Sequence, residues 1–388
     1  MTHRRPPRPP TDGQPVIVAA LRTPIGTAGR SLAAVTAPAL AAPVLAALVK
    51  CIDIAPADIQ DVVLGNCMGP GGDVARVASL VAGLPHTLPA LTVDRQCGSG
   101  LAAITVAAAM LRSGPGAVLA GGVESASTAP WRFWPPIPGG VPQRYERAPF
   151  APDSIGDPDM GLAADLLAAE YGVSRERQDA YAARSHTRAV ETARTGGFVA
   201  ETIPLAGVSR DDRPRTGVTA ARLARLPPAF RENGTVTVGN SCGINDGAAA
   251  VTIVDDSTHQ ELGVPGLRVL ATATAGVHPN RPGLGIVPAA RLALKRAGLT
   301  LDDMDVVELN EAFAGQVLAC CDALDLDPER VCVEGGALAL GHPWGASGAV
   351  LVVRLFSQLV RAAEGRYGLA AIAVGGGQGV AMVVERCP

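Results

Sequence analysis

Hydrophobic residues along the chain fall into two alternating patterns. Short apolar runs suit buried strands, as in PVIVAAL (15–21) and DVVLGN (61–66), and the longer stretch LAAPVLAALVKCI (40–52) between them predicts a helix. A second helical stretch, LAAITVAAAMLRSG (101–114), is followed by a strand, AVLAGGVES (117–125). Strands that alternate with helices in this way predict an α/β fold.

The second half of the chain repeats one of these units. GASGAVLVVRLFSQLVRAAEG (345–365) has the pattern of a helix that opens on small residues, and GLAAIAVGGG (368–377) that of a strand ending in glycines. CGSGLAAITVAAAMLRSG (97–114), with the strand that follows it, has the same layout. The similarity predicts an internal duplication of two α/β halves.

Residues 126–250 differ from both halves. They contain the Pro-rich WRFWPPIPGGVP (131–142), a charged helical stretch at 174–193 and an arginine-rich stretch at 210–226. We expect an inserted lid over the first half. Each of its arginines could contact a phosphate-bearing ligand or belong to a solvated charged face, and the two alternatives are weighted equally. These arginines are Arg210, Arg213, Arg215 and Arg222.

Composition and charge narrow the class of protein. The formal net charge is −3 with no basic or acidic block, which argues against nucleic acid or a membrane surface as the main partner. The opening MTHRRPPRPPTDGQ (1–14) is typical of a disordered tail and not of a secretory signal. The eight cysteines show neither CxxC nor metal-ligand spacing, so we expect no metal site, mostly buried reduced thiols and a cytoplasmic location.

Two stretches carry a candidate nucleophile and a candidate base. Cys97 lies in VDRQCGSGLAAI (93–104), where a strand ends and a helix begins, and the helix dipole is expected to lower the pKa of its thiol. His342 lies in the glycine-rich GGALALGHPWGASGA (335–349), before a helix start that favours a neutral imidazole. The alternative for each is a packed structural side chain. His186, in the charged helix, is interpreted as a surface residue.

A third stretch, ELNEAFAGQ (308–316), ends a strand with Asn310 and Glu311. Asparagine can orient a water or a histidine, and glutamate can hold the loop. Without further context a plain helix cap is the favoured interpretation of both residues.

Taken together, CGSG, NEAFAGQ and GGALALGHPWGASGA resemble the motifs of the thiolase family in order and spacing. VIVAALRTPIG (16–26), GNSCGINDGAAA (239–250) and the terminal GGGQGVAM (375–382) resemble it too, so the resemblance covers the chain from about Pro15 onward. It implies an α/β fold with a duplicated five-layered α-β-α-β-α core. The implied organisation is a tail at 1–14, a first half at 15–257 with a loop domain inserted at about 126–240, and a second half at 258–388.

The resemblance also implies roles for single residues. Cys97 resembles the nucleophile that takes an acyl group from coenzyme A, His342 the base that activates it, and Asn310 the residue that holds a water in a first oxyanion hole. The backbone N–H groups of Cys97 and Gly375 resemble a second oxyanion hole. Family positions that line the coenzyme A site match Met160, Arg215, Cys242 and Phe313. The family uses acyl-CoA thioesters as substrates, binds no metal or cofactor, and forms dimers or tetramers, so we expect a homodimer or homotetramer.

One family position differs. The family carries a second cysteine in the terminal glycine loop, which moves a proton at the α-carbon of an acetyl thioester, and Ala373 stands there. A methyl group cannot exchange a proton, and loss of a general base costs about 10²–10⁴ in rate. The sequence alone gives no argument that another cysteine takes its place, whether Cys67, Cys242, Cys320 or Cys332.

We therefore predict an acyltransferase that takes an acyl group from acyl-CoA onto Cys97 and passes it to a second substrate, with an impaired non-decarboxylative Claisen step. The acceptor would be an amine, an alcohol, water or a malonyl-type thioester. One alternative is a conventional acetyl-CoA C-acetyltransferase or 3-ketoacyl-CoA thiolase. Another is a non-catalytic acyl-CoA-binding partner subunit, against which the retention of Cys97, Asn310 and His342 argues.

Overall fold

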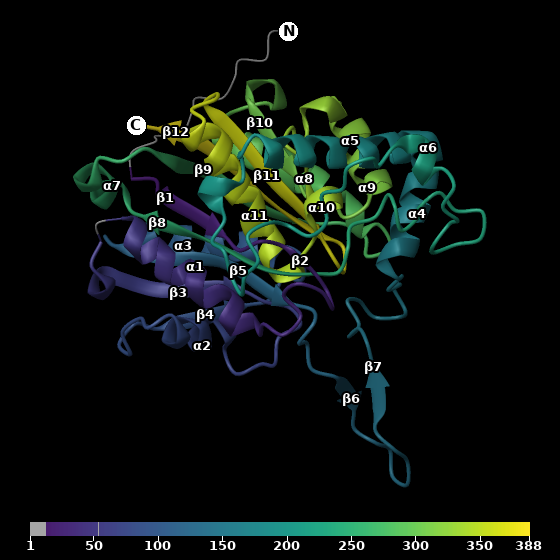
Figure 1. Cartoon of the computed structure of the whole chain (residues 1–388), viewed down its shortest axis with the longest axis horizontal. Helices are drawn as coiled ribbons and strands as arrows, with labels where there is room; N and C mark the ends of the chain where they lie inside the picture. The colour runs from purple at the N-terminus through teal and green to yellow at the C-terminus, as the bar shows by residue number, and fades with distance from the viewer. Residues whose placement is uncertain (1–12, 53) are drawn as a thin grey trace.

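The computed structural model describes residues 13–52 and 54–388, so nearly all of the tail predicted at 1–14 lies outside the described residues. Its centre is a large mixed sheet (Figure 1). The spatial order of its strands is β10 (Val306–Leu309), β11 (Tyr367–Val374), β12 (Gln378–Cys387), β9 (Gly266–Gly276), β1 (Val16–Arg22), β8 (Asn245–Val254), β5 (Ala117–Ser125), β3 (Ile59–Gly65) and β4 (Ala90–Val93), with β2 (Gly26–Thr27) paired to β8.

The sheet consists of two halves, and helices cover both of its faces. Helices α3 (Ser99–Met110) and α11 (Trp344–Phe356) pack against each other in the middle and contact strands of both halves. Helices α1 (Ala37–Cys51) and α2 (Val74–Val81) cover the outer face of the first half. Helices α8 (Ile286–Ala297) and α9 (Ala314–Leu324) form the outer layer of the second half. The predicted α/β class, with duplicated helix–strand units at α3–β5 and α11–β11, is confirmed.

The two halves are joined edge to edge and through the central helices. Strands β1 and β9 pair over only two residue pairs, Val16 with Arg268 and Ile17 with Leu267. The central helices approach closely because both have glycine as the second residue, Gly100 in α3 and Gly345 in α11. A Cβ atom at Gly100 would lie 2.8 Å from the Gly345 carbonyl oxygen, so only glycine fits there. This contact brings the N-termini of α3 and α11 together.

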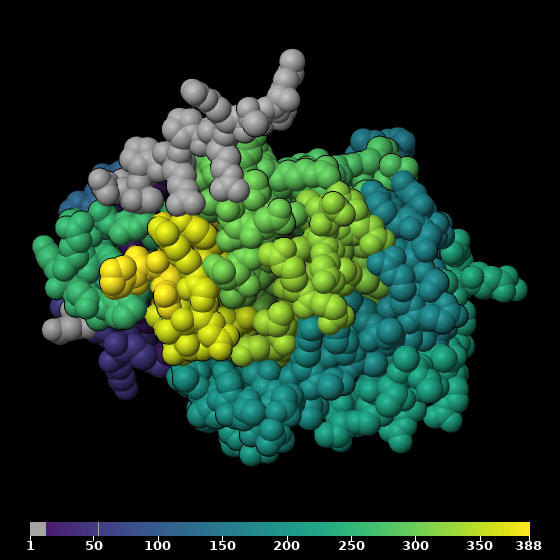
Figure 2. All heavy atoms as spheres, turned by 90° about the horizontal axis from the view of Figure 1, so that it is seen from above, coloured from purple at the N-terminus to yellow at the C-terminus, as the bar shows by residue number. Residues whose placement is uncertain are grey.

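Only part of the segment inserted after β5 lies over the first half as predicted, since Ile203, Leu205 and Val208 pack against the core of that half. Its helices α4 (Met160–Glu170) and α5 (Arg175–Arg194) pack against α9, and α5 also packs against α10 (Ala337–Leu340), all in the second half. Figure 2 shows the teal surface of this segment directly against the yellow-green surface of the second half. Apolar residues of α4 and α5 share a buried cluster with α9, and the hydroxyls of Tyr181 and Ser185 also donate to the buried carboxylate of Glu311 over 2.9 and 2.7 Å.

The remaining elements are short. A hairpin of β6 (Arg132–Trp134) and β7 (Gln143–Tyr145) projects away from the body (Figure 1). Helices α6 (Ala220–Leu223) and α7 (Asp256–Leu262) complete the α-helices of the described chain. Single turns of 3-10 or π helix occur at Pro56–Asp58, Leu111–Ser113, Val199–Glu201, Pro282–Gly285, Leu301–Asp303, Pro328–Arg330 and Ser357–Arg361. Within the described ranges, none of the helices has the length and apolar character needed to cross a bilayer.

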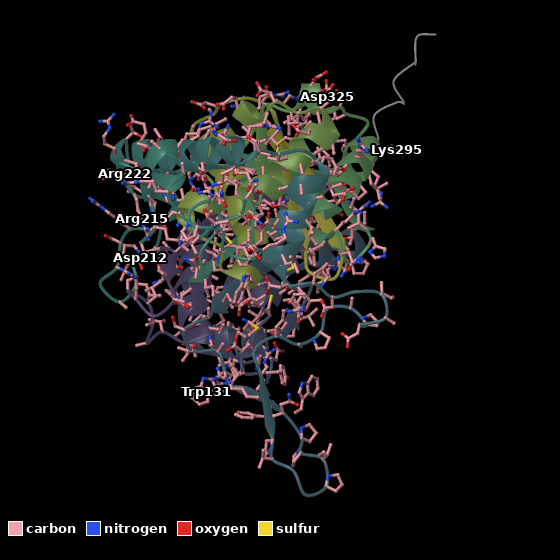
Figure 3. All side chains as sticks on the ribbon, turned by 90° about the vertical axis from the view of Figure 1, so that its right-hand side faces the viewer. Trp131, Asp212, Arg215, Arg222, Lys295 and Asp325 are labelled. Atoms are coloured by element: carbon pink, nitrogen blue, oxygen red, sulfur yellow. The ribbon has the colours of Figure 1, made fainter. Side chains whose placement is uncertain are left out.

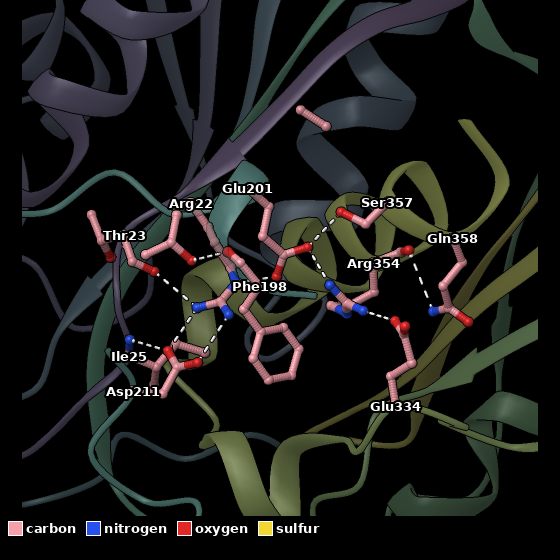
Figure 4. A network of polar contacts seen from close by, with 12 residues as sticks. Arg22, Thr23, Ile25, Phe198, Glu201, Asp211, Glu334, Arg354, Ser357 and Gln358 are labelled. Atoms are coloured by element: carbon pink, nitrogen blue, oxygen red, sulfur yellow. Dashed lines mark hydrogen bonds and ion pairs between the residues drawn. The ribbon is translucent and has the colours of Figure 1, made fainter. Parts of the chain in front are cut away.

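A buried ion network ties the inserted segment to both halves (Figure 4). Glu201 accepts from Arg22 of β1 over 2.7 Å, and its other oxygen pairs with Arg354 of α11. Asp211 binds the same Arg22 guanidinium through both oxygens, over 2.7 and 2.9 Å. The Phe198 ring lies 5.3 Å from the Arg22 guanidinium and 4.8 Å from that of Arg354. Burial raises the pKa of Glu201, but the two arginines outweigh it and hold that pKa below its usual value.

Candidate active site

Cys97 lies in a sharp turn between β4 and α3. Gln96 has a φ of 44°, in the left-handed region, and Gly98 is the N-cap of α3. The Ser99 hydroxyl accepts from the Arg95 N–H over 2.8 Å and donates to the Gln96 carbonyl over 2.6 Å, which fixes the turn. A Cβ atom at Gly98 would lie 2.7 Å from Cγ2 of Val374, so the turn packs directly on the end of β11.

Burial dominates the electrostatics of Cys97. It raises the pKa of the thiol to about 12, and the nearby thiol of Cys242 adds to this effect. The backbone N–H groups of Cys97 and Gly375 point at the sulfur and act in the opposite direction. The expectation that the helix dipole leaves Cys97 with a lowered pKa is therefore wrong, because desolvation outweighs the dipole. The resting side chain is a thiol that needs a base.

His342 is held in the form that a base requires. Its backbone N–H donates to Oδ1 of Asn245 over 2.9 Å, and its Nδ1 lies 2.6 Å from the Ser347 hydroxyl. That hydroxyl donates to the Pro343 carbonyl over 3.0 Å, so it accepts from Nδ1–H and leaves the lone pair on Nε2. Burial lowers the pKa of His342 to about 4, which keeps the ring neutral. Nε2 is buried without a hydrogen-bond partner in the described chain.

Asn310 and Glu311 have different surroundings, and neither caps a helix. The N-cap of α9 is Phe313. Nδ2 of Asn310 lies 3.5 Å from Nδ1 of His342, and its backbone N–H donates to the Ala371 carbonyl over 3.0 Å. Glu311 accepts the hydroxyls from α5 and the Leu338 N–H, so it holds the inserted segment in place.

Two of the predicted coenzyme A positions share an aromatic neighbour that the sequence did not single out. Phe313 packs edge-on against Phe230, with ring centroids 5.9 Å apart. Met160 begins α4, and a Cβ atom at the next residue, Gly161, would lie 2.2 Å from the Phe230 ring. The backbone of Cys242 lies beside that of the residue before Phe313, since the Cys242 N–H donates to the Ala312 carbonyl over 2.9 Å.

The arginines of the inserted segment have separate surroundings. Arg215 is exposed and lines an open hollow with Thr27, Arg30, Ser31 and Asp212. Figure 3 shows Arg215, Asp212 and Arg222 along one edge of the molecule. Arg213 is partly buried and lies over the backbone of Gly243, where an added Cβ would be 2.3 Å from its Nη1.

His186 is buried, and its interpretation as a surface residue is wrong. Its Nδ1 accepts from the Arg215 N–H over 3.4 Å, and burial, followed by the charges of Arg213 and Arg215, lowers its pKa to about 4. The helical spacing of Tyr181, Ser185 and His186 with Ala182 and Ala189 marks one face of α5, and this spacing is a signal in the sequence that identifies the buried face.

The position that differs from the family pattern lies at the end of β11. Ala373 pairs with Gly379 of β12 and is partly buried. Its neighbour Val374 contacts the Cys97 turn, and a Cβ atom at Gly375 would lie 2.7 Å from the Phe150 ring. Among the described residues, no three His, Cys, Asp or Glu side chains converge in a way that could hold a metal ion.

Two family models match the chain. The model described as thiolase, N-terminal domain, matches residues 15–257, and that described as thiolase, C-terminal domain, matches residues 265–386. A putative acetyl-CoA C-acetyltransferase from Bacillus subtilis is 42% identical over 95% of this chain and 98% of its own length. An acetyl-CoA acetyltransferase from Pseudomonas aeruginosa is 41% identical over 96% and 99%.

Solved structures agree with these matches. The acetyl-CoA acetyltransferase of Bacillus anthracis superposes with a TM-score of 0.89 at 38% identity, covering 97% of this chain and 99% of that one. Human mitochondrial 3-ketoacyl-CoA thiolase, in complex with CoA, superposes with a TM-score of 0.90 at 35% identity, covering 97% and 98%.

Proposed function

Because the chain belongs to the thiolase family of acyltransferases, we propose that it takes an acetyl group from acetyl-CoA onto Cys97 and passes it to a second acetyl-CoA. This reaction is that of a conventional acetyl-CoA C-acetyltransferase. The names of the relatives from Bacillus subtilis and Pseudomonas aeruginosa favour it over the impaired variant predicted from Ala373.

The observation that carries the proposal is the pair of backbone N–H groups, of Cys97 and Gly375, aimed at the Cys97 sulfur. When the thiol attacks a thioester, an oxyanion forms on the carbon that becomes bonded to that sulfur. Donors fixed beside a developing oxyanion are worth about 3–4 kcal/mol each. The glycine-rich end of β11 therefore contributes its backbone to catalysis and needs no ionisable side chain for that purpose.

His342 has the properties of the base for this first step. Its Nε2 lone pair accepts the proton of Cys97, which is a thiol at rest, and the buried ring is neutral before it does so. Asn310, beside the imidazole, is suited to position the ring or a water next to the substrate oxygen. Met160, Phe313 and Cys242 are proposed to line the pantetheine path, and Arg215 to meet a phosphate of coenzyme A.

A specific observation favours a second candidate. Ala373 offers no exchangeable proton where the family places its second cysteine. In this candidate the acyl group on Cys97 passes to an acceptor that needs no carbon deprotonation, such as an amine, an alcohol, water or a malonyl-type thioester that loses CO₂.

Intact-mass measurement after mixing the protein with a panel of acyl-CoAs tests both candidates, with Cys97→Ala as the control. An adduct that depends on Cys97 and yields acetoacetyl-CoA with acetyl-CoA alone supports the conventional reaction. An adduct that persists until another acceptor is added supports the second candidate. No adduct with any acyl-CoA refutes both and leaves a non-catalytic acyl-CoA-binding subunit.

A further inference from the structure

Joining two acetyl groups requires a group that removes a proton from the α-carbon of the second thioester. In the proposed reaction His342 serves as the base for the thiol of Cys97, and the methyl group of Ala373 cannot exchange a proton. A second acid–base group must therefore lie near Cys97 if the proposed reaction is to proceed. Two other thiols, those of Cys67 and Cys242, lie close enough to Cys97 to interact with it electrostatically.

The thiol of Cys67 is unsuited to become a thiolate. It donates to the Gln96 carbonyl over 3.0 Å and lies 3.5 Å from the Ser99 hydroxyl, so it is engaged in holding the turn. The carboxylate of Glu124 accepts the Cys67 backbone N–H over 3.2 Å. Burial and then the Glu124 charge raise the pKa of Cys67 well above its usual value.

Cys242 lies in a segment fixed to the candidate active site at both ends. Ser241 forms a bridge with Phe313, and Ile244 forms one with His342. The Cys242 N–H donates to the Ala312 carbonyl, two residues beyond Asn310. The segment thus runs from the Asn310 loop to the His342 loop. In the described chain Cys242 has no side-chain hydrogen bond that would engage its thiol, in contrast to Cys67.

Arg213 gives Cys242 a positive neighbour that lacks a counter-charge. Its Nη2 donates only to the Leu338 carbonyl, over 3.3 Å, and its Nε is buried without a partner. No carboxylate of the described residues forms an ion pair with it. Burial raises the pKa of Cys242 to about 12, and the Arg213 charge acts against that rise. A thiolate at Cys242 would supply the missing counter-charge, because opposite charges in a desolvated site stabilise each other.

We propose that Cys242, beside Arg213, is the second acid–base thiol of this protein and takes over the proton transfer that Ala373 cannot perform. This inference rests on the proposed acetyl transfer. It adds a catalytic role to a residue whose family position implies only contact with coenzyme A.

The proton balance closes within the named groups. His342 takes the proton of Cys97, whose sulfur attacks acetyl-CoA, and passes it to the departing coenzyme A thiolate, so acetylation needs no proton from Cys242. The neutral imidazole then takes the proton of Cys242. The Cys242 thiolate then removes the α-proton of the second acetyl-CoA, and the resulting carbanion attacks the acetyl carbonyl on Cys97. The carbon–carbon bond forms, the carbon–sulfur bond breaks, and the Cys97 thiolate recovers its proton from the His342 imidazolium.

The test separates the two steps in the intact protein. Enzyme is acetylated to completion with acetyl-CoA, the extent is read by intact mass, and formation of acetoacetyl-CoA after a second addition is followed in a single turnover. Cys242→Ala is expected to reach full acetylation but to form acetoacetyl-CoA at least about 100-fold more slowly than wild type. Cys51→Ala, which removes an exposed thiol at the end of α1, is the matched control and is expected to perform both steps normally. Ala373→Cys added to Cys242→Ala is expected to restore the second step.

Each remaining outcome overturns a distinct statement. Normal acetoacetyl-CoA formation by Cys242→Ala overturns the role of Cys242 alone. Acetylated wild type that forms no acetoacetyl-CoA overturns that role and favours an acceptor without carbon deprotonation. Absence of any adduct on wild type overturns the proposed function itself. Cys242→Ser, which keeps the size of the side chain, serves the same comparison if the alanine variant does not fold, and its unchanged second step would equally refute the role.

Discussion

The carboxylate of Glu201 is expected to stabilise the fold strongly, and Glu201→Gln is the perturbation that measures it. The side chain is fully buried between two buried guanidiniums, those of Arg22 and Arg354, and accepts a third hydrogen bond of 2.5 Å from the Ser357 hydroxyl. Glutamine keeps the shape of the side chain but removes the charge. It also turns an amide donor toward groups that are themselves donors.

The expected loss of unfolding free energy depends on the ion pairs that the two arginines keep. Removing one partner of a buried ion pair costs about 3–5 kcal/mol, because a buried charge loses its compensation. Arg22 keeps both contacts with Asp211, and Arg354 keeps Glu334, so we do not expect the loss to exceed this range. With an unfolding entropy of about 2.1 cal/mol/K per residue over 388 residues, the Tm is expected to fall by about 4–6 °C.

Differential scanning calorimetry at pH 7 measures this change. The matched control is Glu191→Gln, which breaks the exposed contact of Glu191 with Arg194 on α5 and is expected to leave the Tm close to wild type. The sign of the pH dependence is also fixed. The pKa of Glu201 is lowered in the folded protein, so its contribution is present above the unfolded pKa and is lost as the pH falls through the folded one. The reasoning is refuted if Glu201→Gln lowers the Tm no more than Glu191→Gln does.

Three further outcomes are expected. Ser347→Ala should slow acetylation of Cys97 by about 5- to 160-fold, because Nδ1–H of His342 loses a buried acceptor worth about 1–3 kcal/mol; an unchanged adduct rate would contradict this. The acetylation rate should stay constant from pH 8 to 6, because the pKa of His342 is lowered to about 4, and a decline centred near pH 6.5 would show a charged imidazole instead. Burial raises the pKa of Glu308 to about 7, so the contribution of Glu308 to wild-type stability declines as the pH rises from about 4.3 to 7, and Glu308→Gln lacks this decline. The stability of that variant relative to wild type in urea unfolding should therefore increase over this range, and a constant difference would contradict the shift.

The repeated helix–strand units could be predicted from the sequence because their pattern is local. Both central helices open on small residues and continue as long apolar runs, and their strands end in glycines or a glycine turn, so α3–β5 and α11–β11 follow from periodicity alone. The candidate nucleophile and base could be singled out for the same reason. Cys97 and His342 each lie in a glycine-framed turn before a helix, and that context is visible within about ten residues.

The surroundings of these residues depend on contacts across hundreds of residues. The pKa of Cys97 is raised by burial, and Val374 and Val380 of the second half pack on the turn that carries it, which no local helix dipole reveals. Helices α4 and α5 of the inserted segment pack on the second half through an apolar cluster with α9, and Glu311, far along the chain, accepts the hydroxyls of α5. Arg213 lies beside Cys242 for a similar reason, since the two belong to different loops that are each bound to the second half, at Leu338 and Ala312. Local periodicity and turn chemistry thus determine which helices and strands form and where they end. The burial and electrostatics of the site depend on many neighbouring groups, and only the tertiary structure brings these groups together.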